Sequence, residues 1–178
     1  MACSRYGLLT KPSLLDFLQE KLITIVPFAT ALIAIFRYSD HILWPLLYIG
    51  IIIFHMTHIV IKRCPHCAYY KTETRGITCL WLRWVPKIRE IQSSPVPGYF
   101  RIYTPIAIFT ITFFPVYWLA SQWELLLIYA LSWGVLALSL YTAGCARCID
   151  FSCKFNAVPQ EARYEYLSSE NKYPNSTN

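Results

Sequence analysis

Two Cys-x-x-Cys motifs are the residues of this chain best suited to chemistry. The first is Cys64–Cys67, with Pro and His between the cysteines, and the second is Cys145–Cys148, with Ala and Arg between them. Each motif follows a long apolar run, and each has one further cysteine downstream, Cys79 and Cys153. This spacing lets the backbone fold into a knuckle that presents both sulfurs to one tetrahedral metal ion. It is also typical of redox-active thiol pairs. The pattern therefore predicts either a metal site or a thiol couple.

A zinc-like metal site is the chemistry that we favour for these cysteines. Two knuckles at one membrane face would supply four thiolates, which complete a zinc site and tie the second half of the chain to the first. A single four-thiolate site does not use Cys79 and Cys153. A second metal site, an iron–sulfur cluster and a thiol–disulfide couple are therefore alternatives. The C-x2-C-x4-C spacing of the second motif differs from the usual ferredoxin run. The predicted metal ligands are Cys64, Cys67, Cys79, Cys145, Cys148 and Cys153.

Three histidines are weaker candidates for the same site. His66 lies inside the first motif, while His55 and His58 lie near the end of the apolar run before it. Their spacing of three places His55 and His58 on one helical face. Ionisable groups inside a membrane span are functional candidates by default. For these two, hydrogen bonding between helices competes with ligation of a metal or a quinone.

The composition predicts an all-α membrane protein. Of the 178 residues, 56% are hydrophobic and 16% aromatic, and the mean hydropathy is +0.38. The apolar runs lie at 22–36, 42–61, 102–119 and 125–143. The last three have the ~20 residues that cross a bilayer, and the short first run borrows apolar residues before it as an amphipathic lead-in. We expect four transmembrane helices arranged as two antiparallel hairpins, in one domain over 1–167.

The positive charges predict the orientation in the cell membrane. Of the 16 Lys and Arg residues, Arg37 alone lies in the tight connections after the first and third runs. The others lie in the N-terminal tail, the 62–101 loop and the tail from 144 onward, and basic residues mark the cytoplasmic side. Both termini and all six cysteines are thus predicted to be cytoplasmic. A reducing compartment disfavours structural disulfides there. This topology accounts for the net charge of +6 without a nucleic-acid partner.

The two cytoplasmic segments have features of their own. In the loop, Trp81 and Trp84 alternate with basic residues, a pattern typical of a segment that lies in the headgroup plane. In the tail, Pro159 begins a short helix that we expect to end near Leu167, and 168–178 is predicted to be disordered. Within the runs, Pro27 and Pro115 are predicted to kink their helices.

Sequence motifs also indicate a resemblance. The stretch from Cys64 through Cys79 to Pro86-Lys87, with Cys145–Pro159, resembles an uncharacterised group of small four-helix prokaryotic membrane proteins. These share a CPxC…C…PK loop and a terminal CxRCxxFxCxxNxVP signature. The chain departs from the group at Lys154-Phe155, where a Pro-Leu-like pair is expected. The resemblance implies six linked cysteines and no particular activity.

The expected role is that of an accessory or assembly subunit of a larger membrane complex, not an enzyme. With 15% charged residues, short outer turns and no soluble domain, the sequence shows little machinery for turnover. Lipid and other membrane subunits are the expected partners. The alternative is a membrane thiol–disulfide/quinone oxidoreductase, or an iron–sulfur electron-transfer subunit, that uses the same cysteines. The vitamin K reductase-like enzymes have a similar size and helix count, but their working cysteines face the oxidising side.

Overall fold

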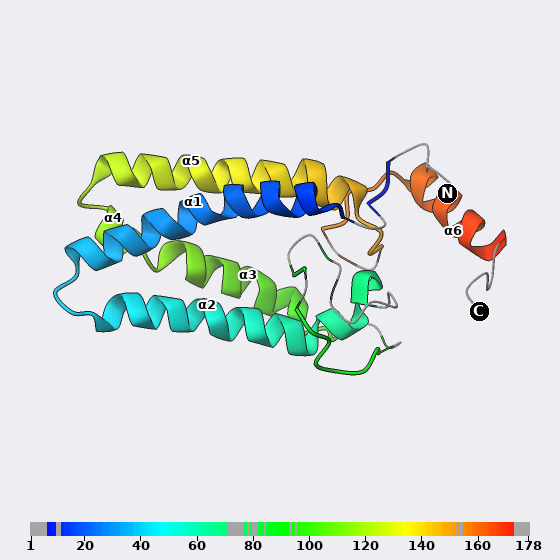
Figure 1. Ribbon diagram of the computed structural model, residues 1–178, viewed down its shortest axis with the longest axis horizontal. Helices are drawn as coiled ribbons and strands as arrows, with labels where there is room; N and C mark the ends of the chain where they lie inside the picture. Colours follow the sequence, from blue (N-terminus) through cyan, green and yellow to red (C-terminus); the bar gives the residue numbers. More distant parts are fainter. Residues whose placement is uncertain are drawn as a thin grey trace.

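The computed structural model is all-helical, with its helices side by side (Figure 1). It describes residues 7–9, 12–70, 77, 79, 82–83, 85–92, 94, 96–151, 153 and 155–172. The α-helices are α1 (Leu14–Tyr38), α2 (Leu43–Lys62), α3 (Phe100–Phe113), α4 (Val116–Leu119), α5 (Trp123–Ser139) and α6 (Gln160–Lys172). Four short turns complete them: η1 (Cys64–His66), η2 (Ala68–Tyr70), η3 (Leu140–Gly144) and η4 (Cys145–Arg147). An isolated β-bridge joins Leu9 and Cys148.

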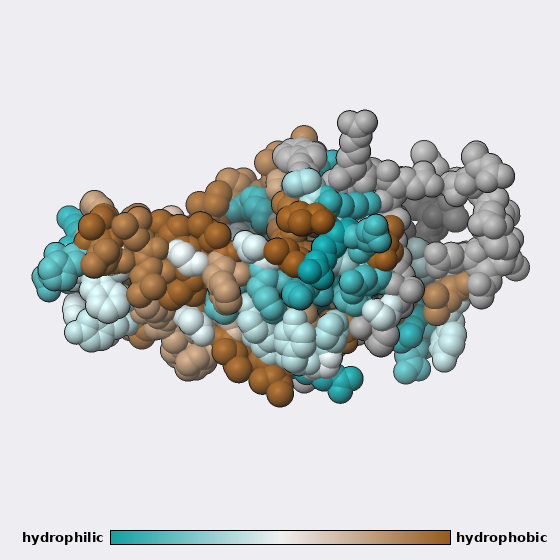
Figure 2. All heavy atoms as spheres, turned by 90° about the horizontal axis from the view of Figure 1, so that it is seen from below, coloured by the Kyte–Doolittle hydropathy of each residue, from teal (hydrophilic) through white to brown (hydrophobic). Residues whose placement is uncertain are grey.

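Four of the helical segments are long and apolar enough to cross a membrane. They are Leu14–Tyr38, Leu43–His66, Phe100–Leu119 and Trp123–Arg147. Figure 2 shows apolar side chains gathered along the helices on the face seen from below. The prediction of an all-helical chain with four long apolar helices is confirmed for the described residues, and these helices fit a multi-pass membrane protein. The helices start or end a few residues beyond the predicted runs.

The first helix begins earlier than the apolar run because a capping box starts it. The Ser13 hydroxyl accepts a hydrogen bond from the Asp16 N–H at 3.1 Å, and the Asp16 carboxylate accepts one from the Ser13 N–H at 2.9 Å. These bonds satisfy backbone donors that the first turn leaves open. The predicted lead-in is therefore part of α1 itself.

The two prolines predicted to kink their helices have different surroundings. Pro115 stands between α3 and α4 and is the N-cap of α4, so the third span is divided there. A proline lacks the N–H of the helical ladder and its ring clashes with the preceding turn, which explains the division. Pro27 lies inside α1, which is assigned as one helix from Leu14 to Tyr38.

The membrane-embedded core lies where the first and last spans meet. α1 packs most extensively against α5, and Figure 1 shows the two helices side by side. Ala31, Ala34 and Ile35 of α1 are fully buried in a cluster to which α2, α3, α4 and α5 also contribute. Small residues let helix backbones approach closely, which stabilises helix pairs in lipid. Across the bundle, the Tyr48 hydroxyl donates to the Ile111 carbonyl at 3.2 Å.

The helix after the fourth span is longer than predicted. α6 continues to Lys172, past the expected end near Leu167. Residues 173–178 of the predicted disordered tail lie outside the described residues, as do Trp81 and Trp84 of the predicted interfacial segment. No interfacial placement is assigned to these two tryptophans.

Candidate functional site

The two Cys-x-x-Cys motifs adopt matching backbone conformations at the ends of two spans. Cys64 begins the 3-10 turn η1 directly after α2, and Cys145 begins the 3-10 turn η4 after α5 and η3. The second cysteine of each motif is extended, with φ −83° and ψ 144° at Cys67 and φ −80° and ψ 129° at Cys148. Each motif therefore forms the same backbone turn, a 3-10 turn that ends in an extended cysteine, and we use the word knuckle for this turn.

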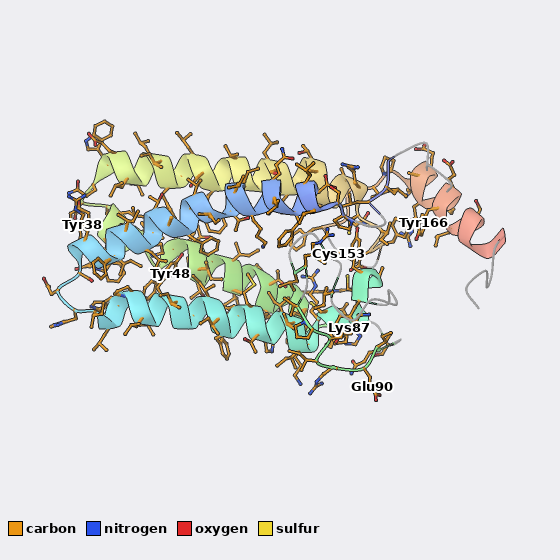
Figure 3. All side chains as sticks on the ribbon, viewed as in Figure 1. Tyr38, Tyr48, Lys87, Glu90, Cys153 and Tyr166 are labelled. Atoms are coloured by element: carbon orange, nitrogen blue, oxygen red, sulfur yellow. The ribbon has the colours of Figure 1, made fainter. Side chains whose placement is uncertain are left out.

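Three segments that are distant in sequence meet around these knuckles. The Leu9 N–H donates to the Arg147 carbonyl at 2.7 Å, and Leu9 pairs with Cys148 in the isolated bridge. The Tyr69 hydroxyl donates to the Leu9 carbonyl at 2.7 Å. We call this region the Cys-rich cap: the described residues of 7–9, 63–92 and 145–158. Figure 3 shows Cys153 at the end of the bundle that also carries Lys87 and Tyr166.

Side chains of one motif contact groups of the other across the cap. The Arg63 guanidinium donates to the Cys153 sulfur at 3.1 Å. The Cys67 thiol is hydrogen-bonded to the Asp150 carboxylate, and Tyr69 is hydrogen-bonded to Cys148. The structure thus brings both cysteine triads to one end of the molecule. None of these six cysteines forms a disulfide in the part of the chain that the structure describes.

The first triad is held in a small apolar cluster of its own. Cys64 is buried with Val60, Tyr70 and Ile77, and Cys79 packs against this group. Tyr70 closes the loop over the cluster, because its hydroxyl donates to the Arg89 carbonyl at 2.7 Å and accepts from the Arg89 N–H at 3.0 Å. These contacts position Cys79 beside the first knuckle although fifteen positions separate it from Cys64.

Burial disfavours the thiolate forms of Cys67 and Cys148, the second cysteines of the two motifs, in the absence of a metal. Burial raises the pKa of Cys67, and the Asp150 carboxylate beside it raises that pKa further. Burial likewise raises the pKa of Cys148 to about 11, against the opposing effect of the Asp150 N–H, which donates to its sulfur at 3.4 Å. The Tyr69 N–H has the same opposing effect on Cys67. Both knuckles therefore aim a backbone donor at the sulfur of their second cysteine, a bond that favours a thiolate.

The donor atoms of the cap gather without forming a closed metal site. Among the described residues, no three His, Cys, Asp or Glu side chains converge closely enough to hold an ion. The donor set is the one that zinc prefers, but the sulfurs would have to approach one another to bind it. Metal sites commonly form only as the ion binds.

Of the three histidine candidates, His66 belongs to the cap. Its Nδ1 is 2.7 Å from the Ser94 carbonyl oxygen. Because a carbonyl only accepts, Nδ1 must carry the proton, and neutral His66 then has its lone pair on Nε2. Metal-ligating histidines are commonly oriented by this kind of bond.

His55 and His58 lie apart from the cap, in an aromatic cluster between α2 and α3. His55 Nδ1 is 2.7 Å from the Tyr103 hydroxyl, and the His58 and Tyr103 ring centroids are 4.3 Å apart. Phe100 also lies against His58, with centroids 5.5 Å apart. His55 therefore has the interhelical hydrogen bond that competed with ligation in the sequence analysis. His58 has ring contacts only, and its Nδ1 is buried without a hydrogen-bond partner.

Three residues that the sequence analysis did not single out link the two motifs. They are Arg63, Tyr69 and Asp150, whose contacts with Cys153, Cys148 and Cys67 are described above. Asp150 lies two positions after a predicted ligand, so its proximity to Cys148 was readable from the sequence. The cross-cap contacts of all three depend on the meeting of segments more than 75 positions apart.

Comparison with known proteins adds no relative. No protein family, no curated protein and no solved structure matches the chain at a significant level.

Proposed function

We propose that the chain is an accessory or assembly subunit of a larger membrane complex, and that its Cys-rich cap binds a zinc-like metal ion at the cytoplasmic face. The observation that carries the proposal is the pair of matched knuckles, placed at one end of the bundle and linked by contacts between their side chains. Four thiolates from two knuckles would tie the second and fourth spans together. The remaining cysteines and His66 stand beside them as further donors.

Charge supports a thiolate-bound metal in this place. Four thiolates around one Zn²⁺ leave a net charge of −2, which needs compensation in a half-buried site. Arg63 already donates to Cys153, and Arg147 lies within the second motif. Hydrogen bonds from a guanidinium to an anionic sulfur are charge-assisted and stronger than neutral ones.

The thiol-redox alternative finds less support in the cap. A nucleophilic cysteine needs a lowered pKa and access for its partner. The pKa values of Cys67 and Cys148 are raised instead. We therefore rank metal binding above thiol–disulfide chemistry. A visible absorption spectrum of the purified protein distinguishes zinc from an iron–sulfur cluster.

The surface of the last span leaves room for a partner subunit. Only 11% of the central apolar window of Trp123–Arg147 is buried within the chain. Leu131, Val135 and Leu138 are among its exposed side chains. Such a face needs lipid or another subunit against it.

One preparation tests both parts of the proposal. The full chain is purified in mild detergent under reducing conditions, and zinc, iron, the visible spectrum and co-purifying subunits are measured. We expect about one zinc per chain or more, no visible chromophore and stoichiometric partners. Cys64→Ser and Cys148→Ser should lose the zinc and unfold at lower temperature, whereas Cys3→Ser, outside both triads, should keep it.

The negative outcomes separate the two claims. Metal-free wild-type protein with a reducible Cys64–Cys67 disulfide would refute the zinc site. A brown chromophore would show that the cap binds an iron–sulfur cluster instead of zinc. A stable monomer without partners would refute the accessory-subunit role whatever the metal content. Should the serine variants not fold, a zinc chelator must lower the unfolding temperature of the wild type.

A further inference from the structure

A groove lies between α1 and α2 near the end of the bundle opposite the cap (Figure 1). Its volume is about 420 Å³, which falls within the ~300–1,000 Å³ of sites that hold small molecules. Most of its lining consists of large apolar side chains that the chain itself leaves exposed: Ile33, Phe36, Ile42, Leu46 and Ile49. An empty groove gains no packing contacts, so in a bilayer an apolar occupant fills it.

The lining is apolar apart from one residue, Arg37. This residue lies in the last turn of α1 and is exposed. Its side chain forms no ion pair or hydrogen bond within the part of the chain that the structure describes. Long basic side chains lay their aliphatic stem along apolar surface and extend the charged head toward water. The Arg37 guanidinium is therefore available to a ligand at the mouth of the groove.

Aromatic side chains place this mouth at the level of the lipid headgroups. Tyr38 ends α1, and Trp44 lies in the first turn of α2. Figure 3 shows Tyr38 at the end of the bundle opposite Cys153. Tyr and Trp are enriched where membrane and water meet. Arg37 precedes Tyr38 directly, so its guanidinium lies at the depth of the lipid phosphates.

Both signs of charge are present at the mouth. Arg37 is the cation, and Asp40 is an exposed anion in the connection between α1 and α2. The further acid at this end, Glu124, belongs to α5, which lies at the opposite edge of the bundle from α2 (Figure 1). α2 begins without a capping side chain and without an acid in its first turn. The positive end of its dipole therefore also favours an anion there.

We propose that the groove binds one acyl chain of phosphatidylethanolamine, with the lipid phosphate on Arg37 and the lipid ammonium on Asp40. The headgroup is zwitterionic and matches a site that has one charge of each sign. Phosphatidylglycerol has no cation for Asp40, and the ammonium of phosphatidylcholine has no N–H to donate. Arginine binds phosphate through charge-assisted hydrogen bonds. The acyl chain gains little over the surrounding bilayer, which is equally apolar, so the headgroup provides the selectivity.

Lipid titration of the full chain in detergent, followed by native mass spectrometry, tests the proposal. Phosphatidylethanolamine, phosphatidylglycerol and phosphatidylcholine with identical acyl chains are added in equal amounts. We expect one phosphatidylethanolamine per chain, bound in preference to the other two. Arg37→Gln should lower its affinity about tenfold, the effect of losing one charge-assisted hydrogen bond. Arg101→Gln is the matched control, because it removes an exposed arginine from α3 at the cap end and should bind like the wild type.

Two further variants separate the headgroup contacts from the groove. Asp40→Asn should abolish the preference for phosphatidylethanolamine over phosphatidylglycerol, because the ammonium loses its partner. Glu124→Gln removes the exposed acid of α5 and should retain that preference. Leu46→Trp adds volume inside the groove and should weaken binding of phosphatidylethanolamine while Arg37 and Asp40 stay in place.

Three results would overturn the proposal. Equal binding of the three lipids by the wild type would mean unselective contact with the bilayer, and unchanged affinity in Arg37→Gln would place the lipid elsewhere. A subunit that crosslinks to a photoreactive group at Ile33 would assign the groove to a protein partner. Should Arg37→Gln not fold, phenylglyoxal modification of Arg37 in the wild type decides. Phosphatidylethanolamine must slow that modification, and equal rates with and without it would refute the site.

Discussion

At the residue scale, the cap shows how burial controls thiol chemistry. Cys148 is half-buried, accepts the Asp150 N–H and is hydrogen-bonded to Tyr69. Desolvation outweighs these bonds, so the neutral thiol is the favoured form of Cys148 in the metal-free protein. A bound metal would reverse the balance, because it binds the thiolate and releases the proton.

The first prediction concerns the pH dependence of Cys148 alkylation. A rise of its pKa from 9.0 to about 11 lowers the thiolate fraction at neutral pH about a hundredfold. In metal-free, folded protein we expect Cys148 to react with iodoacetamide about a hundred times more slowly than in urea, with the rate rising only toward pH 11. Mass spectrometry of quenched samples measures both rates.

The same shift has a consequence for stability. Because the folded pKa is raised, the neutral thiol stabilises the metal-free fold fully below about pH 9, and this contribution is lost as the pH rises through about 11. Rapid alkylation at pH 7 in the folded protein would contradict the burial argument and return the redox alternative to first place.

At the element scale, the helices meet through small residues in the membrane and through polar contacts at the cap. Ala31 and Ala34 of α1 are fully buried in the core cluster that also contains Tyr48, Leu119 and Tyr129. The Tyr129 hydroxyl donates to the Thr112 carbonyl at 2.7 Å, which links α5 to α3. The position of each knuckle is therefore set by the packing of the span before it.

The second prediction tests that packing. Ala34→Leu places three extra carbons in a site with no free surface, and overpacking of this kind costs ~1–3 kcal/mol. Thermal unfolding in detergent should show a lower midpoint for this variant. Ala130→Leu is the matched control, because Ala130 is exposed on α5 and the same added volume meets no neighbour in the chain. Equal midpoints for the two variants would show that α1 is not packed as described.

At the scale of the whole molecule, the two ends of the bundle differ in chemistry. One end carries the connections after α1 and α4, next to Arg37 in the last turn of α1. The other end carries the cap, the Lys87 segment and α6 (Figures 1 and 3). We propose that the cap end faces the cytoplasm. Fifteen of the sixteen Lys and Arg residues lie in the N-terminal tail, the 62–101 loop and the tail from 144 onward, and basic residues mark the cytoplasmic side.

The third prediction is the outcome of labelling intact cells with an impermeant maleimide. Ser121→Cys, in the exposed connection between α4 and α5, should be labelled before permeabilisation. Ser168→Cys, exposed in α6, and the wild type with its native cysteines should be labelled only afterwards. The reverse pattern would place the cysteines on the oxidising side and favour the disulfide chemistry.

The sequence by itself determined the class of the fold and the elements that carry the chemistry. Runs of ~20 apolar residues admit few structures besides membrane helices, since each backbone polar group must be paired within the segment. The two-residue spacing of Cys64–Cys67 and Cys145–Cys148 was sufficient to predict both knuckles, because a turn of this length depends on local geometry alone. Pro115 likewise predicted an irregularity in the third span, expected as a kink and found as the division between α3 and α4.

Only the tertiary structure decided which of these parts meet. The contact of Arg63 with Cys153 joins residues ninety positions apart, and no local pattern encodes it. Glu20 directly precedes the first apolar run, and the packing of α1 on α5 buries it against Ser139. The separation of His55 and His58 from the cap also follows from packing, since Tyr103 and Phe100 of α3 surround them. Apolar periodicity identifies helices, whereas the pairing of their polar side chains depends on the angles and registers at which the helices pack.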